Sequence, residues 1–317
     1  MKHTGTQHRR MARATARAFA LLAAVAVATP ATAQQEGPRI EFTVRPAHPG
    51  TDERSAAWLI RTEKPGAHVH DTVVVQNLGT LPVDLILYPS DAQTTPEGDF
   101  TVEPEEGDDD GVASWITLDV LEVSLEPDEY ETIPVHITVP ENASPGDHAG
   151  GIVARTKHPL EGGPLPSHIA VAARLYLTVD GPRVYDLRLT DLRAETRDDG
   201  VHFFIDMYNA GNMLVEVGGD YEVRGPLGLG GGDGTIDSPA TLIPGSTATK
   251  EVVWDGKAVL GGRHTATFHL AYTDGHTQAA AISFFLTPPP MVLVIAGLLA
   301  LALLALVATP ILRRVTL

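Results

Sequence analysis

The chain has 317 residues and no cysteine, and its 40 Asp and Glu against 23 Lys and Arg give a net charge of −17. An acidic surface of this kind excludes binding to nucleic acid or other polyanions through a basic patch. The length is sufficient for two domains with separate hydrophobic cores, so the absence of disulfides does not exclude an extracellular location.

The first 33 residues have the features of a secretory signal peptide. Basic residues precede an apolar stretch from Ala18 to Ala28 that is too short to cross a membrane, and Ala31-Thr32-Ala33 matches a cleavage site. Cleavage there would leave Gln34 as the new N-terminus. The pair Arg9-Arg10 suggests the twin-arginine route as an alternative, but the residues around it match that pattern poorly, so ordinary secretion is favoured.

Residues 38–180 are predicted to form an Ig-like β-sandwich domain. Short apolar or alternating stretches are separated by turn residues about every ten positions, without a convincing amphipathic helix. The predicted strands are 40–44, 57–60, 69–75, 83–88, one or two within 114–123, 132–139, 150–156 and 169–179.

A second Ig-like domain is predicted over residues 181–287, with Gly181-Pro182 as the domain boundary. Its expected strands are 184–192, 201–208, 213–217, 220–224, 247–254, 264–272 and 279–286. The glycine-rich run 225–234 lacks the strand-to-helix setting of a phosphate-binding loop, and we interpret it as a hairpin loop. The predicted fold class is therefore all-β, with two tandem Ig-like β-sandwich domains.

The two sets of strands look like copies of one pattern. In each set a strand ends in Asn-x-Gly, at Asn77 to Gly79 and at Asn209 to Gly211, where both residue types tolerate a turn. A Leu-x-Pro turn later precedes another strand, at Leu125 to Pro127 and at Leu242 to Pro244. Tandem modules of this kind bind or space other molecules and rarely catalyse reactions.

The stretch from Met291 to Leu312 is predicted to be a transmembrane helix, after a spacer of three prolines that begins at Pro288. Its 18 residues from Met291 to Ala308 carry no charge, and about 20 apolar residues cross a hydrocarbon core of about 30 Å. Residues 313–317, with Arg313 and Arg314, would be cytoplasmic. This predicts a single-pass protein of the cell membrane with its N-terminus outside. The signal contains five of the basic residues, and Arg313 and Arg314 are two more. The part expected outside the cell then has 16 basic and 40 acidic residues, a net charge of −24.

Four stretches of the first domain, Phe42–Pro46, Val75–Asn77, Trp115–Leu118 and Val139–Ile152, resemble the WxL-interacting protein family of Gram-positive surface proteins. The similarity extends over residues 39–314 and is strongest over 42–179. The resemblance implies that the first domain binds peptidoglycan, that the second engages another protein, and that the C-terminal helix spans the membrane.

Aromatic residues are the candidates for glycan contact, because their rings can stack on sugar rings. Trp58 and Tyr88 are the two candidate glycan-binding residues, with a place in the core as the alternative for each. Trp115, within an alternating strand, is predicted to be a core residue.

No metal, cofactor or catalytic residue is predicted. His68 and His70 would lie on the same face of a strand, but no third ligand is identified, which favours a structural or solvated pair over a metal site. Glu103 to Asp110 could hold Ca²⁺ but lacks the spacing of a calcium loop, which favours a solvated acidic loop. The chain has no Gly-x-Ser-x-Gly elbow and no zinc-protease motif, so we do not expect an enzyme.

The sequence thus predicts a membrane-anchored surface scaffold. Its expected partners are peptidoglycan or another envelope glycan, a surface protein, and the lipid bilayer through Met291–Leu312. The alternative is a passive stalk, or an accessory subunit of a membrane complex, without glycan binding.

Overall fold

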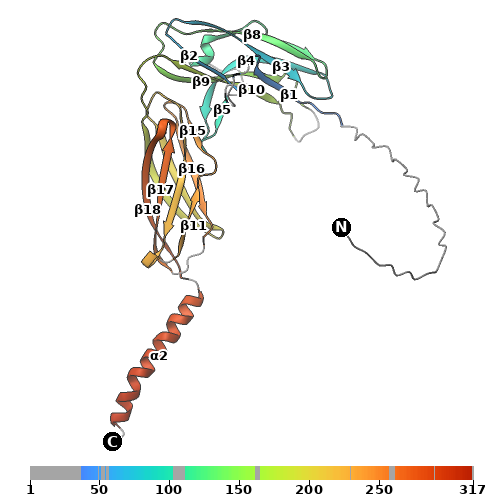
Figure 1. The fold of residues 1–317 in the computed structure, drawn as a ribbon. Helices are drawn as coiled ribbons and strands as arrows, with labels where there is room; N and C mark the ends of the chain where they lie inside the picture. Colours follow the sequence, from blue (N-terminus) through green and yellow to red (C-terminus); the bar gives the residue numbers. More distant parts are fainter. Residues whose placement is uncertain are drawn as a thin grey trace, which may run out of the picture. The chain divides into compact units, whose positions relative to one another are not determined.

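The computed structural model describes residues 37–48, 50, 54, 57–102, 111–160, 165–228, 230–256, 261–288 and 290–315, with side chains up to Leu306 apart from that of residue 274. The predicted signal peptide (1–33) and the acidic loop Glu103–Asp110 lie outside the described residues. Residues Pro38–Leu317 form one compact unit. Its described part is a succession of β-strands followed by one helix (Figure 1).

The first module, residues 42–179, contains two sheets that face each other. Its strands are β1 (Phe42–Pro46), β2 (Leu59–Glu63), β3 (His68–Asn77), β4 (Val83–Thr94), β5 (Phe100–Val102), β6 (Ile116–Leu118), β7 (Glu122–Leu125), β8 (Tyr130–Thr138), β9 (Gly146–Thr156) and β10 (Ala170–Val179). One sheet has the order β1-β3-β8-β6, and the other has the order β2-β10-β9-β4-β5 with β7 also paired to β4. The pairing of β2 with β10 is parallel.

The core of the first module consists of the residues that alternate along the facing strands. Val73, Val75, Ile133 and Val135 from one sheet have no exposed surface, and neither has Leu85 from the other. Burial of each such side chain contributes about 1.5 to 3 kcal/mol. The alternating pattern therefore specifies which face of each strand points inward, as the sequence predicts.

The second module, residues 187–286, also has two sheets and its own core. Its strands are β11 (Leu187–Arg197), β12 (Gly200–Asn209), β13 (Val215–Arg224), β14 (Gly231–Thr235), β15 (Ala240–Leu242), β16 (Thr247–Trp254), β17 (Gly262–Tyr272) and β18 (His276–Leu286). The sheet orders are β11-β12-β16 and β14-β13-β17-β18, with β15 also paired to β13. Together the four sheets are consistent with two Ig-like sandwiches. The predicted domain boundary at Gly181-Pro182 lies between the two cores.

Two of the local predictions that differ from the structure have an evident physical cause. The two strands expected at 213–217 and 220–224 form the single strand β13, because Gly219 (φ +145°) lets the chain continue close to β17: a Cβ there would lie 2.1 Å from the carbonyl oxygen of His269. The stretch predicted as strand at 114–123 begins instead with a 3₁₀ turn, η1 (Val112–Trp115). The Asp91 carboxylate stabilises this turn by accepting hydrogen bonds from the backbone N–H groups of Gly111 and Ala113, each at 2.8 Å.

A buried asparagine closes the first module at the Asn-x-Gly turn. Asn77 has no exposed surface, and its Nδ2 donates to the carbonyl oxygens of Leu81 (2.9 Å) and Leu125 (3.0 Å). Its Oδ1 accepts from the backbone N–H of Gly79 at 2.8 Å. One side chain thus joins the end of β3, the start of β4 and the end of β7.

The second module repeats this arrangement atom for atom. Asn209, also without exposed surface, donates to the carbonyl oxygens of Met213 (2.8 Å) and Leu242 (3.0 Å) and accepts from the N–H of Gly211 (3.1 Å). A Cβ on Gly79 would lie 2.4 Å from the carbonyl oxygen of Arg39, and one on Gly211 would lie 2.2 Å from that of Val184. The glycine of each motif is therefore required for the close approach of the preceding chain.

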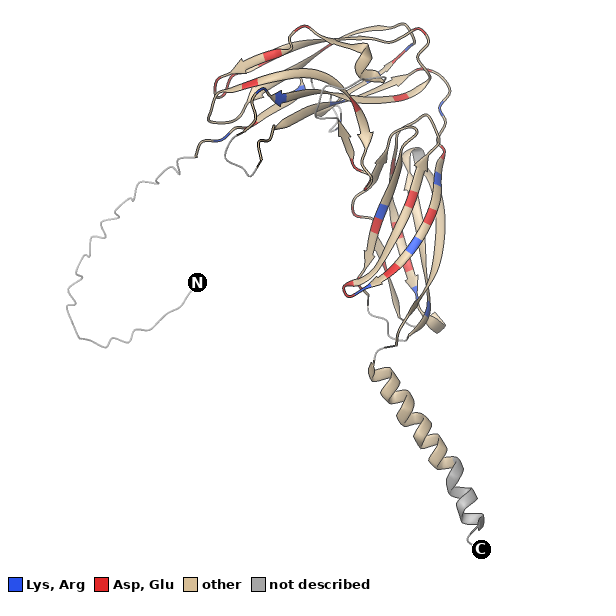
Figure 2. Ribbon diagram, turned by 180° about the vertical axis from the view of Figure 1, so that it is seen from behind, with Lys and Arg blue, Asp and Glu red and all other residues tan. Residues whose placement is uncertain are grey.

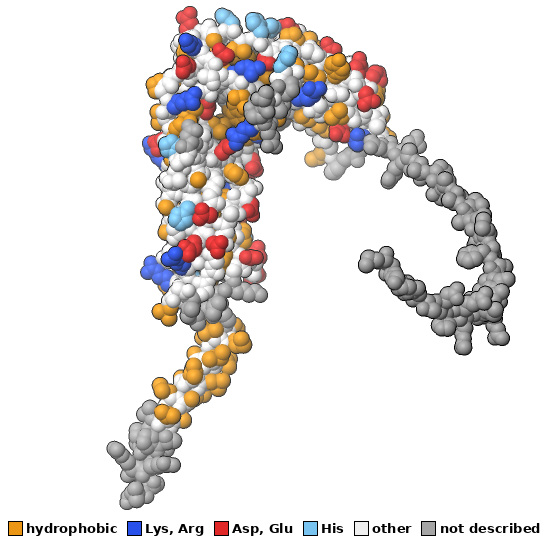
Figure 3. Space-filling view, in the orientation of Figure 1, with side chains coloured by type: hydrophobic (Ala, Val, Ile, Leu, Met, Phe, Trp, Pro, Cys, Tyr) orange, Lys and Arg blue, Asp and Glu red, His pale blue; other side chains and the backbone are white. Residues whose placement is uncertain are grey.

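The C-terminal segment is helical, as predicted. Helix α2 spans Pro290–Val315, and its large apolar side chains from Leu293 to Leu306 are all at least half exposed (Figure 3). Within the described part of the chain, however, no helix has both the length and the apolar character that crossing a membrane requires. The membrane crossing predicted over Met291–Leu312 is therefore not confirmed.

We expect Asn77→Ala and Asn209→Ala each to lower the free energy of unfolding by about 2 to 4 kcal/mol. Each change leaves two carbonyl groups and one N–H without their partner. Two of the three lost hydrogen bonds are fully buried in each module, and an unsatisfied buried group costs about 1 to 3 kcal/mol. Urea denaturation measures the effect. Asn142→Ala, at an exposed position, is the control and should change the stability by less than about 0.5 kcal/mol. Equal stabilities of all three variants would show that the buried amides do not hold the modules together.

Candidate functional site

The turn that precedes β9 forms the first contact between the two modules. The backbone N–H of Asp147 donates to the carbonyl oxygen of Asn212 at 2.8 Å. The Asn212 side chain donates in return to the carbonyl oxygens of Pro145 (2.9 Å) and Pro182 (2.8 Å). Gly146 (φ +121°) lies between Pro145 and Asp147 in the chain. A Cβ on Gly146 would be 2.1 Å from the carbonyl oxygen of Asn212. The close contact therefore requires glycine at this position.

The Asp147 carboxylate extends this contact. It accepts from the Thr178 hydroxyl (2.6 Å) within the first module and from the backbone N–H of Leu214 (2.8 Å) in the second. The stretch Val139–Ile152, on which the family resemblance mainly rests, thus contains residues that join the modules. Gly150 of that stretch has a packing role, because a Cβ there would lie 2.7 Å from the Ser90 carbonyl oxygen.

The hairpin between β4 and β5 forms the second contact. The carbonyl oxygens of Pro96 and Gly98 accept from the backbone N–H groups of Thr249 and Thr241, each at 2.7 Å. The Thr94 hydroxyl donates to the carbonyl oxygen of Thr241 at 3.0 Å. We call these two sets of contacts, at 94–98 and at 145–147, the module junction.

An aromatic cluster lies beside the sheet of the first module that contains β5 and β10. The rings of Trp58 and Phe100 each lie 5.3 Å from that of Tyr176, centroid to centroid. The Arg174 guanidinium lies 5.4 Å from the Trp58 ring and 4.5 Å from the Phe100 ring, which are cation–π distances. Burial raises the pKa of Tyr176, against the opposing effect of Arg174, so the phenol is protonated at neutral pH.

A second arginine completes this cluster and links it to the second module. Arg54 lies 5.8 Å from the Trp58 ring and pairs with Glu216 of β13 at 2.5 Å. The backbone N–H of Trp58 donates to the Arg54 carbonyl oxygen (2.9 Å), which holds the two residues close together. We define the aromatic cluster as Trp58, Phe100 and Tyr176 with Arg54 and Arg174. Its rings can stack on an apolar face, and its guanidinium groups suit a carboxylate.

The two predicted glycan-binding residues, Trp58 and Tyr88, lie in different environments. Trp58 belongs to the aromatic cluster and is half-buried, whereas Tyr88 is only 3% exposed and has no ring face available to a sugar. Trp115 is half-buried against the first core, with its ring 4.6 Å from that of His148. Phe100 and Tyr176 were missed because only the pairing of distant strands brings them to Trp58.

The histidines form a different pair from the one considered in the sequence. His70 meets His136 on the neighbouring strand, with their Nδ1 atoms 2.7 Å apart, and the His136 Nε2 lies 3.0 Å from Asp119. His68 lies near the Thr138 hydroxyl at 3.4 Å. Among the described residues, no group of three or more His, Cys, Asp or Glu is arranged to hold a metal ion.

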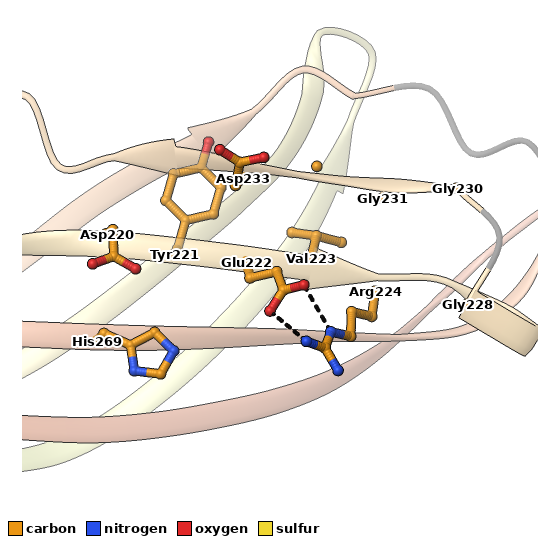
Figure 4. Close-up of a pocket in the computed structure, with 11 residues that line it drawn as sticks. Asp220, Tyr221, Glu222, Val223, Arg224, Gly228, Gly230, Gly231, Asp233 and His269 are labelled. Atoms are coloured by element: carbon orange, nitrogen blue, oxygen red, sulfur yellow. Dashed lines mark hydrogen bonds and ion pairs between the residues drawn. The ribbon is translucent and has the colours of Figure 1, made fainter.

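The second module has a shallow polar recess of about 840 Å³ beside β13 and β14 (Figure 4). Glu222 and Arg224, two positions apart on β13, pair beside the recess at 2.7 Å, and hydrogen bonding to Arg224 lowers the pKa of Glu222. The glycine-rich run contributes η2 (Pro226–Gly228) and β14, which pairs with β13 as a hairpin. The recess is open, and its ion pair is satisfied.

Buried His202 in the second module has two acidic partners. Its Nδ1 lies 2.6 Å from Glu251 and its Nε2 lies 2.9 Å from Asp199. Hydrogen bonds to these carboxylates, with Glu251 the stronger influence, raise the pKa of His202 above its ordinary value of 6.5. The protonated form is thus favoured in the folded state.

Comparisons with known proteins give a likeness of fold alone. No protein-family model matches the chain, and no curated protein matches it. Among solved structures, the class 5 fimbriae chaperone CfaA is 11% identical over 78% of this chain and 100% of its own, with a TM-score of 0.38. The YadV chaperone is 12% identical over 77% and 99%, with a TM-score of 0.35. The ASH/PapD-like domain 7 of human CEP192 is 15% identical over 49% and 96%, with a TM-score of 0.27.

All three TM-scores are below 0.5, and these likenesses assign the chain to no family. The resemblance to the WxL-interacting protein family stays a prediction, since no comparison reports it.

We expect Gly146→Ala to loosen the module junction. The new Cβ would collide with the Asn212 carbonyl oxygen and would require a strained φ. Hydrogen exchange should become faster at the Asp147 and Leu214 amides. Gly218→Ala is the matched control, because its Cβ would find its nearest neighbour at an ordinary 3.7 Å. Unchanged exchange at both amides in Gly146→Ala would contradict this account of the junction.

The stability of the second module should depend on pH through His202. Because the folded pKa is raised, the stabilisation is complete below pH 6.5 and is lost as the pH rises through the folded pKa. The free energy of unfolding should therefore be lower at pH 9 than at pH 6, and His202→Gln should reduce this difference. Urea denaturation at both pH values measures it, and an identical pH dependence in the variant would refute the assignment.

Proposed function

We propose that this protein is a membrane-held scaffold of the cell envelope that binds an envelope glycan bearing carboxylates, such as peptidoglycan, through the aromatic cluster. The observation that carries the proposal is the combination of Trp58, Phe100 and Tyr176 with the guanidinium groups of Arg54 and Arg174. Aromatic rings supply stacking surface for sugar rings, and guanidinium groups bind carboxylates by two parallel hydrogen bonds.

The net charge of the chain favours glycan binding at a specific site over general electrostatic attraction of the glycan to the protein surface. The chain carries a net charge of −17, so an anionic glycan would be repelled by most of the surface. Arg174 contacts two aromatic rings, and Arg54 is held by Glu216 of the second module. Binding would therefore depend on this cluster and on the junction that brings Glu216 to it.

The proposed location rests on the two ends of the chain. The signal-like residues 1–33 favour export, and the apolar side chains on α2 between Met291 and Leu306 favour insertion into an apolar environment. In this arrangement both modules are displayed outside the cell, and the second is available for a partner protein.

Binding to insoluble peptidoglycan tests the glycan function. We expect the full chain in detergent to sediment with peptidoglycan, and Arg174→Gln and Trp58→Ala each to weaken retention about tenfold, which corresponds to the loss of about 1.4 kcal/mol. Trp115→Ala makes the same chemical change outside the cluster and should retain binding. Circular dichroism checks that each variant is folded.

Absence of sedimentation above the level of a control Ig-like domain would reject glycan binding. It would then favour the second candidate function, a stalk or accessory subunit of a membrane complex. The hydrogen bonds of the module junction favour that alternative, because they would make the two modules a stiff spacer.

A further inference from the structure

One edge strand of the second module lacks the charges, prolines, bulges and short length that commonly prevent edge-to-edge association. Strand β18 has 11 residues, His276–Leu286, with no Lys, Arg, Asp, Glu or Pro among them. Within the described residues it pairs with β17 alone. An exposed edge presents unpaired N–H and C=O groups, and proteins usually protect such edges with charges, prolines, bulges or short length.

The other edge strands in the described part of the chain carry such protection. Strands β5, β6 and β15 have three residues each, and β7 has four. Charged residues occur in β1, β2, β11, β14 and β16, with Pro46 in β1 in addition. Strand β11 also has an irregular register between Leu189 and Asp191. The unprotected length of β18 is thus a local exception.

The side chains of β18 suit pairing with a copy of the same strand. Ala279, Ala281 and Ser283 are small and exposed, so they would not obstruct a second strand. Phe285 is 75% exposed and would gain cover. Antiparallel pairing over the full strand places the two-fold axis at the middle residue, Ala281. Phe285 of each copy then lies opposite Thr277 of the other, without an opposed pair of charges.

The charges beside β18 also favour a second copy. The neighbouring edge strand β11 lies on the same side of the sandwich, where the rings of Tyr185 and His276 are 5.1 Å apart. It carries Arg188, Arg193 and Arg197 against Asp191 and Glu195, a balance that contrasts with the acidic chain. Figure 2 shows basic and acidic residues together on the strands of the second module. Repulsion between two acidic copies is therefore weak at this edge.

We propose that β18 is a self-association edge, through which two copies of this chain form an antiparallel, two-fold symmetric β18–β18 pair. Closed two-fold interfaces are the commonest form of self-association, and main-chain hydrogen bonds would supply the contact. The pair would join two sheets of order β14-β13-β17-β18 into one continuous sheet. This inference does not depend on glycan binding.

Single cysteines test both the edge and its register, because the natural chain has none. In the full chain in detergent, Ala281→Cys should form a disulfide-linked dimer under mild oxidation, since directly opposed Cβ atoms lie about 4.5 to 5.5 Å apart. Ala279→Cys places its two sulfur-bearing residues four positions apart along the strands, about 13 Å, and should cross-link poorly. Val253→Cys, on the edge strand β16, is the matched control and should remain monomeric on denaturing gels.

A charge variant distinguishes dimerisation through β18 from dimerisation through the apolar helix α2. We expect Ala281→Lys to raise the dimer dissociation constant by about tenfold or more in sedimentation experiments, because it opposes two like charges at the axis. Val253→Lys should leave it unchanged. A monomeric natural chain, equal cross-linking at positions 279, 281 and 253, or a dimer insensitive to Ala281→Lys would each overturn the proposal.

Discussion

The fold of both modules depends on one buried amide in each, Asn77 and Asn209. Each side chain joins three segments of its module through three hydrogen bonds, at a point without access to water. A buried amide stabilises a structure only when its donors and acceptors are satisfied together, so it selects one register among the possible strand pairings. The glycine two positions later then lets the preceding chain pack against the turn.

This constraint also explains how the modules meet. Asn212 directly follows the Asn-x-Gly motif of the second module, and its backbone and side chain bond to the turn at Pro145–Asp147 of the first. The turn that closes one module thus provides the contact surface for the other. The sequence stretch that resembles a peptidoglycan-binding family has a structural function at the junction, whereas the proposed glycan-binding residues lie in the aromatic cluster.

Local patterns predicted the strands well because alternation and turn residues act over a few positions. They failed where both faces of a strand are covered. Val83, Leu85 and Leu87 alternate on β4, but Tyr88, Ser90 and Ala92 on the other side are buried too, so Tyr88 is not available as a glycan contact. They also failed at His70, whose partner His136 lies 66 positions away in the chain. Phe100 and Tyr176 join Trp58 only through the order of strands in the sheet.

The sequence alone determined the all-β class, the two repeated Asn-x-Gly units and the apolar C-terminal helix, since each depends on residues close together in the chain. The tertiary structure decided which of those features meet. It placed Gly146 against Asn212, gathered two arginines around Trp58, and left the uncharged strand β18 at an edge. These outcomes depend on strand order and register, which are set by packing between segments that are distant in sequence.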